Sequence, residues 1–101
     1  METLFSIEFS LKTVHGPENF AVFSIGNDRA YAYGIFEQLK GSHNINEKDF
    51  LFIDFIETKE GLPLNLKMIS CSLSQLAQNC CIITKELFKL KNLEEHSNKD
   101  E

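Results

Sequence analysis

The stretch that decides the fold is residues 50–70, which read FLFIDFIETKEGLPLNLKMIS. Its first part is apolar on both alternating faces: Leu51, Ile53 and Phe55 form one face, and Phe50, Phe52 and Ile56 form the other around Asp54. Strands that are covered on both sides have this pattern. Gly61 and Pro63 then interrupt the run with turn residues. We therefore expect strands over residues 50–57 and 64–70, joined as an antiparallel hairpin.

A long helix is expected after this hairpin. Ser72 and Gln75 have the spacing of a capping box, in which each side chain accepts from the other residue's backbone N–H. Apolar side chains then recur at intervals of three and four, typical of one helical face: Leu73, Leu76, Cys80, Ile83, Leu87 and Leu90. The pattern predicts a helix over residues 73–91. We expect residues 1–93 to form one domain and the acidic tail, residues 94–101, to be disordered.

The first half of the chain has the same layout. Residues 3–13 alternate between apolar and polar side chains, and residues 19–25 are rich in aromatic and β-branched types, so two more strands are expected. Asn27 or Asp28 can cap a helix that ends near Gly41. The order is therefore β-β-α-β-β-α. The most economical assembly is an α+β fold, with a four-stranded antiparallel sheet and two helices packed on one face.

Composition narrows the class of protein. The chain has 101 residues, is 43% hydrophobic and carries a net charge of −5 with a single arginine, which opposes nucleic-acid binding. No apolar run approaches the roughly 20 residues of a membrane-spanning helix, and the first residues lack the basic region of a secretory signal. Three cysteines without a regular spacing indicate reduced thiols. We expect a cytoplasmic protein that binds neither nucleic acid nor membranes.

The expected fold leaves one sheet face without a cover. Two helices cover the first face, whereas Phe50, Phe52 and Ile56 lie on the second, where Leu4 and either Phe20 or Phe23 can join them. Large exposed apolar patches usually mark an interface, and two-fold pairing is the commonest way to cover one. We therefore predict a homodimer, or binding of another protein, through this face or the outward side of the last helix. Alternatively, the tail, a bend in the long helix or a strong sheet twist covers these residues.

Five further residues are candidates for a ligand or reactive site. Cys71 lies at the start of the last helix, where the helix dipole can lower a thiol pKa, although packing across the cap also explains it. Asp54 would have a raised pKa if buried in its apolar run, whereas alternation lets it face solvent. Arg29, at the first helix start, could assist an anion there, but capping accounts for the same segment. Tyr31 and Tyr33 could line a small-molecule pocket between sheet and helices, together with Asp54.

No catalytic residue, metal or cofactor can be assigned from the sequence. Cys71 and Cys80 lie nine positions apart and Cys80 and Cys81 one, whereas paired cysteines of structural zinc sites have two to four residues between them. None of the three histidines belongs to a recognisable motif that would make it the base for a cysteine nucleophile. An enzyme that uses Cys71 or Asp54 is therefore only the third hypothesis, after a protein-interaction module and a small-molecule binding domain.

Several short segments resemble those of known proteins. They are GLPLNLK at residues 61–67, ISC at 69–71, ITKELFK at 83–89, NDR at 27–29 and LKG at 39–41. On these segments the chain resembles a family of short, uncharacterised bacterial proteins over almost its whole length. The resemblance implies a self-contained bacterial protein, and it brings no activity, cofactor or functional residue.

Overall fold

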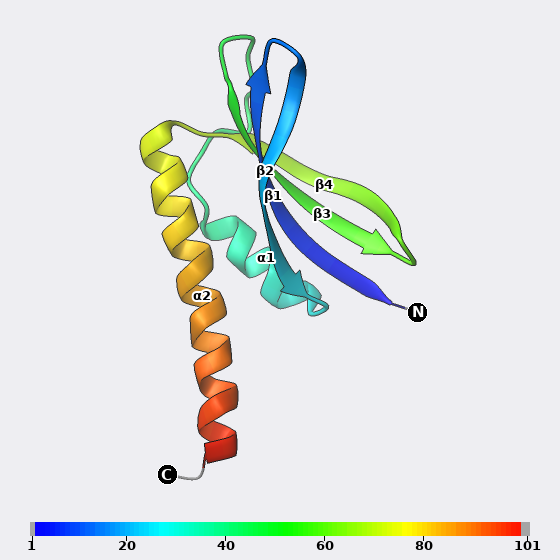
Figure 1. Cartoon of the computed structure of the whole chain (residues 1–101), viewed down its shortest axis with the longest axis vertical. Coiled ribbons are helices and arrows are strands. Elements are labelled where there is room, and N and C mark those ends of the chain that lie inside the picture. Colours follow the sequence, from blue (N-terminus) through cyan, green and yellow to red (C-terminus); the bar gives the residue numbers. More distant parts are fainter. Residues whose placement is uncertain (1, 100–101) are drawn as a thin grey trace.

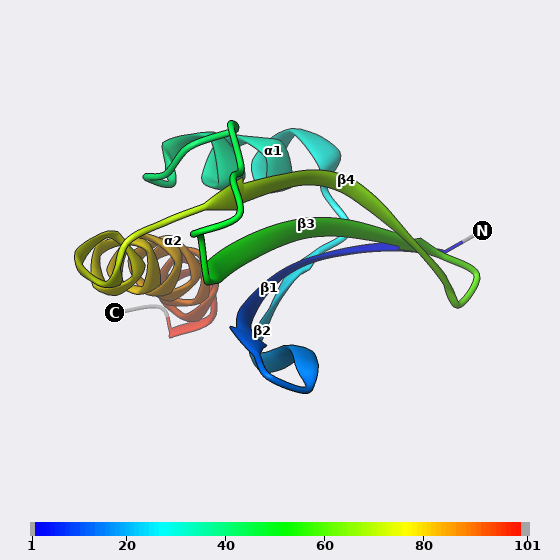
Figure 2. The same cartoon turned by 90° about the horizontal axis from the view of Figure 1, so that it is seen from above.

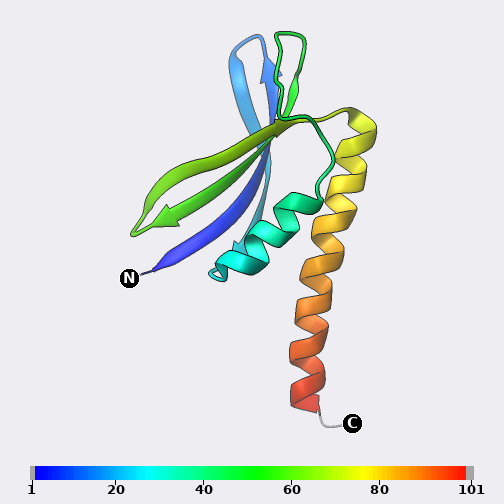
Figure 3. The same ribbon diagram turned by 180° about the vertical axis from the view of Figure 1, so that it is seen from behind.

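The chain has the predicted order of four strands and two helices in a computed structural model, which describes residues 2–99 and side chains as far as Leu90. The elements are β1 (Thr3–Thr13), β2 (Gly16–Gly26), α1 (Arg29–Gln38), β3 (Leu51–Lys59), β4 (Leu62–Ser70) and α2 (Leu73–Lys99). The strands form one antiparallel sheet in the order β2-β1-β3-β4. Both helices lie on the same side of this sheet, as Figures 1 and 3 show from opposite directions. The α+β prediction is confirmed.

The sheet buries one of its two faces against the helices. We call this side the core face. The odd-numbered side chains of β1 and β3 point to it, because successive side chains alternate across a strand. The pairing of β1 with β3 matches apolar residues directly, Ile7 with Phe55 and Phe9 with Ile53. Figure 2 shows the sheet curving as it passes beneath α1. The core is completed by Ile25 of β2, Ile69 of β4, Ala32, Ile35 and Phe36 of α1, and Ile83 of α2.

Aromatic packing holds the middle of the core. The ring of Phe55 stacks on that of Phe36 with centroids 5.0 Å apart, and on that of Phe5 at 5.9 Å. The ring of Tyr33 meets Phe55 edge to face at 4.9 Å. Offset-stacked and edge-to-face pairs are the favourable geometries because they bring the positive ring edge near a negative face. Four of the nine phenylalanines of the sequence are therefore buried core side chains: Phe5, Phe9, Phe36 and Phe55.

Both predicted helix starts are capped as expected. The Asp28 side chain accepts the backbone N–H of Tyr31 at 3.1 Å. At α2, the Ser72 hydroxyl accepts the N–H of Gln75 at 3.1 Å, and the Gln75 side chain accepts the N–H of Ser72 at 2.9 Å. Both arrangements satisfy N–H groups that the first helical turn leaves without partners.

Asn79 joins the two helices and was not predicted. Its side chain is completely buried. The amide oxygen accepts the backbone N–H of Lys40 at 2.7 Å, and the amide nitrogen donates to the Lys40 carbonyl at 2.8 Å. Asn79 lies on the same side of α2 as the buried Ile83. Its amide therefore fixes the core-facing side of α2 to the backbone of Lys40, just after α1.

Three details differ from the sequence predictions. β2 begins at Gly16 rather than residue 19, because the hairpin pairing continues down to Thr13 opposite Gly16. Phe23, an alternative for the uncovered face, packs instead on the core face, where its ring meets Phe9 at 5.5 Å. α2 runs on to Lys99, so residues 94–99 of the expected tail are helical, and residues 100–101 lie outside the described part of the chain. The C-terminal half of α2 extends well past α1 and the sheet (Figures 1 and 3).

Candidate functional site

The candidate site is the second face of the sheet, which we call the outer face. It carries the even-numbered side chains of β1 and β3, because their odd-numbered neighbours point into the core. Register places Val22 of β2 opposite Glu8 and Met68 of β4 opposite Asp54, so all four strands contribute. Neither helix lies on this side in Figures 1 and 3.

Large apolar side chains stand on this face and are partly open to solvent. Leu4 is 49% exposed, Val22 59% and Met68 42%. Phe52 and Ile56, both predicted interface residues, are half-buried on the same face. These five side chains are the apolar part of a surface that the described elements leave uncovered.

Two carboxylates stand directly opposite each other at the centre of the outer face. Glu8 of β1 pairs in register with Asp54 of β3. An asparagine from each flanking strand orients them: Asn19 donates to Glu8 at 3.0 Å, and Asn65 donates to Asp54 at 2.9 Å. Like charges directly opposite in a sheet are destabilising, so this pair reduces the stability of the isolated fold.

The acidic pair lies within an apolar surround. The register forms a row across the sheet, with Val22 and Met68 at its ends and the two carboxylates between them. Phe52 and Ile56 are two residues to either side of Asp54 on the same face of β3. The predictions of Phe52, Ile56 and Asp54 thus concern one surface. Glu8, Val22 and Met68 were not predicted to belong to it, because only the pairing register reveals their position.

Phe50 and Cys71, two further predicted residues, lie beside one hollow. Phe50 precedes β3 and is about half exposed, and its carbonyl accepts the N–H of Lys12 at 2.9 Å. With Cys71 and Gln75 it lines a hollow of about 390 Å³ at the start of α2. Burial, and to a smaller degree neighbouring Cys80, raises the pKa of the Cys71 thiol. A raised pKa leaves little thiolate at neutral pH, which is the opposite of an activated nucleophile.

Arg29 has a structural partner on the core side. Its guanidinium donates to the Glu57 carboxylate at 2.8 Å and lies 5.4 Å from the ring centroid of Phe5. Glu57 is buried near the edge of the core, and Lys59 approaches the same carboxylate oxygen at 3.9 Å. A buried carboxylate requires such a partner because desolvation penalises its charge. Arg29 is therefore engaged within the fold.

The two tyrosines also have packing roles. Tyr33 contacts Phe55, and the Tyr31 hydroxyl donates to the backbone carbonyl of Glu86 in α2 at 2.9 Å. Burial, and then the charge of Glu86, raises the pKa of Tyr31. Asp54 lies across the sheet on the outer face, so the structure does not bring it together with Tyr31 and Tyr33. The hollow between α1, the next loop and β4 measures about 230 Å³ and contains none of the three. That volume is below the roughly 300–1,000 Å³ of typical ligand pockets.

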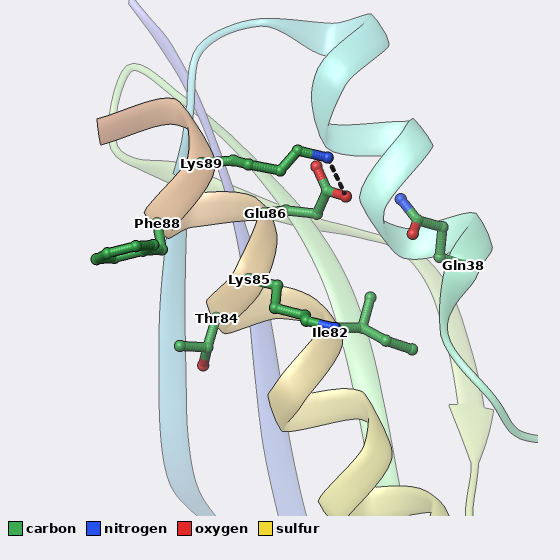
Figure 4. A pocket seen from close by; sticks show the side chains of 7 residues that line it. All are labelled: Gln38, Ile82, Thr84, Lys85, Glu86, Phe88 and Lys89. Carbon is green, nitrogen blue, oxygen red and sulfur yellow. Dashed lines mark ion pairs between the residues drawn. The ribbon is translucent and has the colours of Figure 1, made fainter. Parts of the chain in front are cut away.

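A second exposed surface lies on α2. An open groove of about 600 Å³ runs along α2 beside the end of α1. Figure 4 shows the side chains that line it, which are Gln38, Ile82, Thr84, Lys85, Glu86, Phe88 and Lys89. Phe88 is 64% exposed. Lys89 pairs with Glu86 at 3.6 Å, a one-turn ion pair between a mostly exposed ammonium group and a partly buried carboxylate. The groove therefore holds the ammonium groups of Lys85 and Lys89 together with the carboxylate of Glu86, and the Phe88 ring points away from them (Figure 4).

The sequence matches no protein-family model, and searches of curated proteins and of solved structures found no significant match. Among the residues that the structure describes, no helix is long and apolar enough to cross a membrane. The same part of the chain has no group of three or more His, Cys, Asp or Glu side chains arranged to hold a metal ion.

Proposed function

We propose that this protein is an interaction module that forms a homodimer through the outer face of its sheet. One observation carries the proposal: apolar side chains from all four strands stand uncovered on a single face. Contiguous patches of this kind on small proteins usually mark interfaces. The aromatic ring of Phe52 and the methionine Met68 also belong to residue types that are enriched at interface centres.

The test is a substitution at the centre of that face. We expect Phe52→Asp to raise the dimer dissociation constant at least about 30-fold, equivalent to about 2 kcal/mol, because it buries a third carboxylate beside Glu8 and Asp54. Val14→Asp is the matched control, since Val14 is 95% exposed at the β1–β2 turn. Native mass spectrometry and sedimentation velocity measure both. A parent that stays monomeric up to high micromolar concentration, or a Phe52→Asp dimer as tight as the parent's, contradicts the proposal.

The compartment is part of the proposal. All three cysteines are free, and Cys81 is exposed. Unpaired cysteines are typical of proteins that work in a reducing environment. We place the module in a bacterial cytoplasm, a choice that the resemblance to short bacterial proteins also favours. Alkylation followed by mass analysis of protein isolated without reductant should find three labelled thiols, whereas a disulfide-linked chain would contradict this assignment.

A further inference from the structure

The side of α2 that faces away from α1 is exposed and apolar. Leu73 and Phe88 are each 64% exposed. Ala77, Cys81 and Thr84 lie between them along the chain and are exposed as well. The five residues follow one another at intervals of four, four, three and four, so they lie on one face of the helix. We call this face the α2 stripe.

The α2 stripe lies opposite the buried side of its helix. Asn79 and Ile83 are completely buried on the core-facing side. At 3.6 residues per turn, Cys81 lies about 160–200° around the helix axis from both of them. Thr84 and Phe88 point away from α1 in Figure 4, and no described element lies beside this side of α2 in Figures 1 and 3. A partner can therefore reach the stripe without meeting the sheet of the same chain.

Charged side chains are missing from most of this helix. Residues 73–84 include no Asp, Glu, Lys or Arg, and Lys85 is the first charged residue of α2. Ser74 and Gln78, the exposed neighbours of the stripe, are polar but neutral. The solvent side of a helix is ordinarily where its charges lie, whereas the centre of an interface is depleted of charge. The stripe thus has the composition of a contact surface.

The α2 stripe is symmetric about its middle, which lies just before Cys81. Leu73 and Phe88 are equally far from this point, and so are Ala77 and Thr84. Two antiparallel copies of α2, related by a two-fold axis at the midpoint, therefore place Leu73 against Phe88 and Ala77 against Thr84. Both copies use the same side chains, so the contact closes with two chains.

The sizes of these side chains suit two crossing helices. An open hollow of about 330 Å³ lies beside Cys81 and Thr84, where the stripe has only small residues. Small residues at a crossing point let two helix axes approach to about 8 Å. Crossing helices diverge on either side of this point, and the larger Leu73 and Phe88 lie at the two ends, where they can span the wider gap. Each sheet lies on the far side of its own helix, so the two sheets stay apart.

We infer that α2 is a second self-association surface, on which two copies pair in antiparallel orientation through the α2 stripe. The occupant is a second copy because the stripe matches itself when it is reversed. The contact is weaker than the proposed dimer, since five side chains are far fewer than the roughly 20–30 residues a side of a standard interface. It goes beyond the proposed function, because the outer face lies on the other side of the sheet. In the parent it joins one outer-face dimer to another.

The test uses the Phe52→Asp chain, in which pairing of the outer faces is weakened. This chain should still dimerise in sedimentation velocity, at concentrations at least about 30-fold above those of the parent. Adding Ala77→Glu should raise its dissociation constant at least about tenfold, because a carboxylate then enters the middle of the stripe. Gln78→Glu is the matched control, since it adds the same charge at the exposed neighbouring position outside the stripe. Circular dichroism verifies that each variant is folded.

The outcomes separate the two interfaces. If Phe52→Asp is monomeric up to high micromolar concentration, or if Ala77→Glu and Gln78→Glu leave equal dissociation constants, the inference is wrong and the proposed function stands. If Ala77→Glu alone makes the parent monomeric and Phe52→Asp does not weaken it, the proposed function is wrong and the inference stands. A parent that is monomeric throughout overturns both.

Cross-linking locates the contact without changing the stripe. The two-fold pair sets Cys81 of one copy beside Cys80 and Cys81 of the other, and Cys81 is exposed. A short bismaleimide should therefore join two Phe52→Asp chains. Cys81→Ser should remove most of the cross-linked product, whereas Cys71→Ser, which lies outside the stripe, should not. A yield that is unchanged by Cys81→Ser, or no product where the chain sediments as a dimer, refutes the inference.

Discussion

The two faces of the sheet are built from the same strands and differ in almost every other respect. On the core face, Phe5, Ile7 and Phe9 are at most 1% exposed and are enclosed by helices. On the outer face, the alternate residues of the same strand include half-exposed Leu4 and the carboxylate of Glu8, which has Asp54 opposite it. The core face is arranged for the stability of one chain, whereas the outer face keeps exposed apolar area and like charges that a single chain does not need. The proposed dimer rests on this combination.

The largest contrast should appear when a ring is removed from each face of β3. Phe55→Ala should lower the free energy of unfolding by about 3–5 kcal/mol, because it leaves a cavity between Phe5, Phe36 and Tyr33. Phe52→Ala should lower it by less than about 1.5 kcal/mol, because the Phe52 ring is only half-buried. Urea unfolding at a concentration where the parent is monomeric measures both. Equal losses would mean that the outer face is a second core.

The next effect concerns the buried amide that joins α2 to the chain after α1. Asn79→Ala should lower the free energy of unfolding by about 1–3 kcal/mol, since it removes both hydrogen bonds to the Lys40 backbone and leaves a small cavity. Gln78→Ala is the control, because Gln78 is the exposed neighbour on the same helix. Urea unfolding compares the two. A loss no greater than that of the control would show that apolar packing alone holds α2 in place.

Alkaline pH should weaken the helix side of the molecule. Burial is the main cause of the raised pKa values of Tyr31, Cys71 and Cys80. A neighbouring group adds to each shift: Glu86 to that of Tyr31, Cys80 to that of Cys71, and Cys81 to that of Cys80. The stabilisation by the protonated forms is therefore complete below the unfolded-state pKa values and is lost as the pH rises through the folded-state values. We expect the urea midpoint to fall above pH 8 and to fall less steeply in Cys71→Ala/Cys80→Ala. Equal slopes for parent and variant would contradict the assignment to these thiols.

The smallest effect has the opposite sign and belongs to the outer face. Glu8→Gln should raise the free energy of unfolding of the monomer by a few tenths to about 1 kcal/mol, because it removes the repulsion with Asp54. The gain should shrink in high salt, which screens exposed charges. Glu18→Gln, an exposed carboxylate near the hairpin turn, is the control in urea unfolding. A loss of stability in Glu8→Gln would show that the carboxylate contributes to the monomer fold.

Part of the candidate site was accessible from sequence because its signal is local. The doubly apolar pattern of residues 50–57 predicted that Phe52 and Ile56 occupy a second face, and alternation allowed Asp54 to share it. The opposing Glu8 could not be predicted in the same way, since its place depends on how two strands with more than 30 intervening residues align. The same reason hid the pairing of Arg29 with Glu57 and the bonds from Asn79 to Lys40.

The sequence by itself determined the order of the elements, their caps and the division of β1 and β3 into two faces, because periodicity, turn residues and capping side chains act over a few residues. Only the tertiary structure decided the register of β1 against β3, which brings two carboxylates together, and the burial of Asn79 between the helices. It also placed Phe23 in the core and extended α2 past the body. These features depend on which distant segments meet, and a one-residue slip in register would exchange every side chain between the faces.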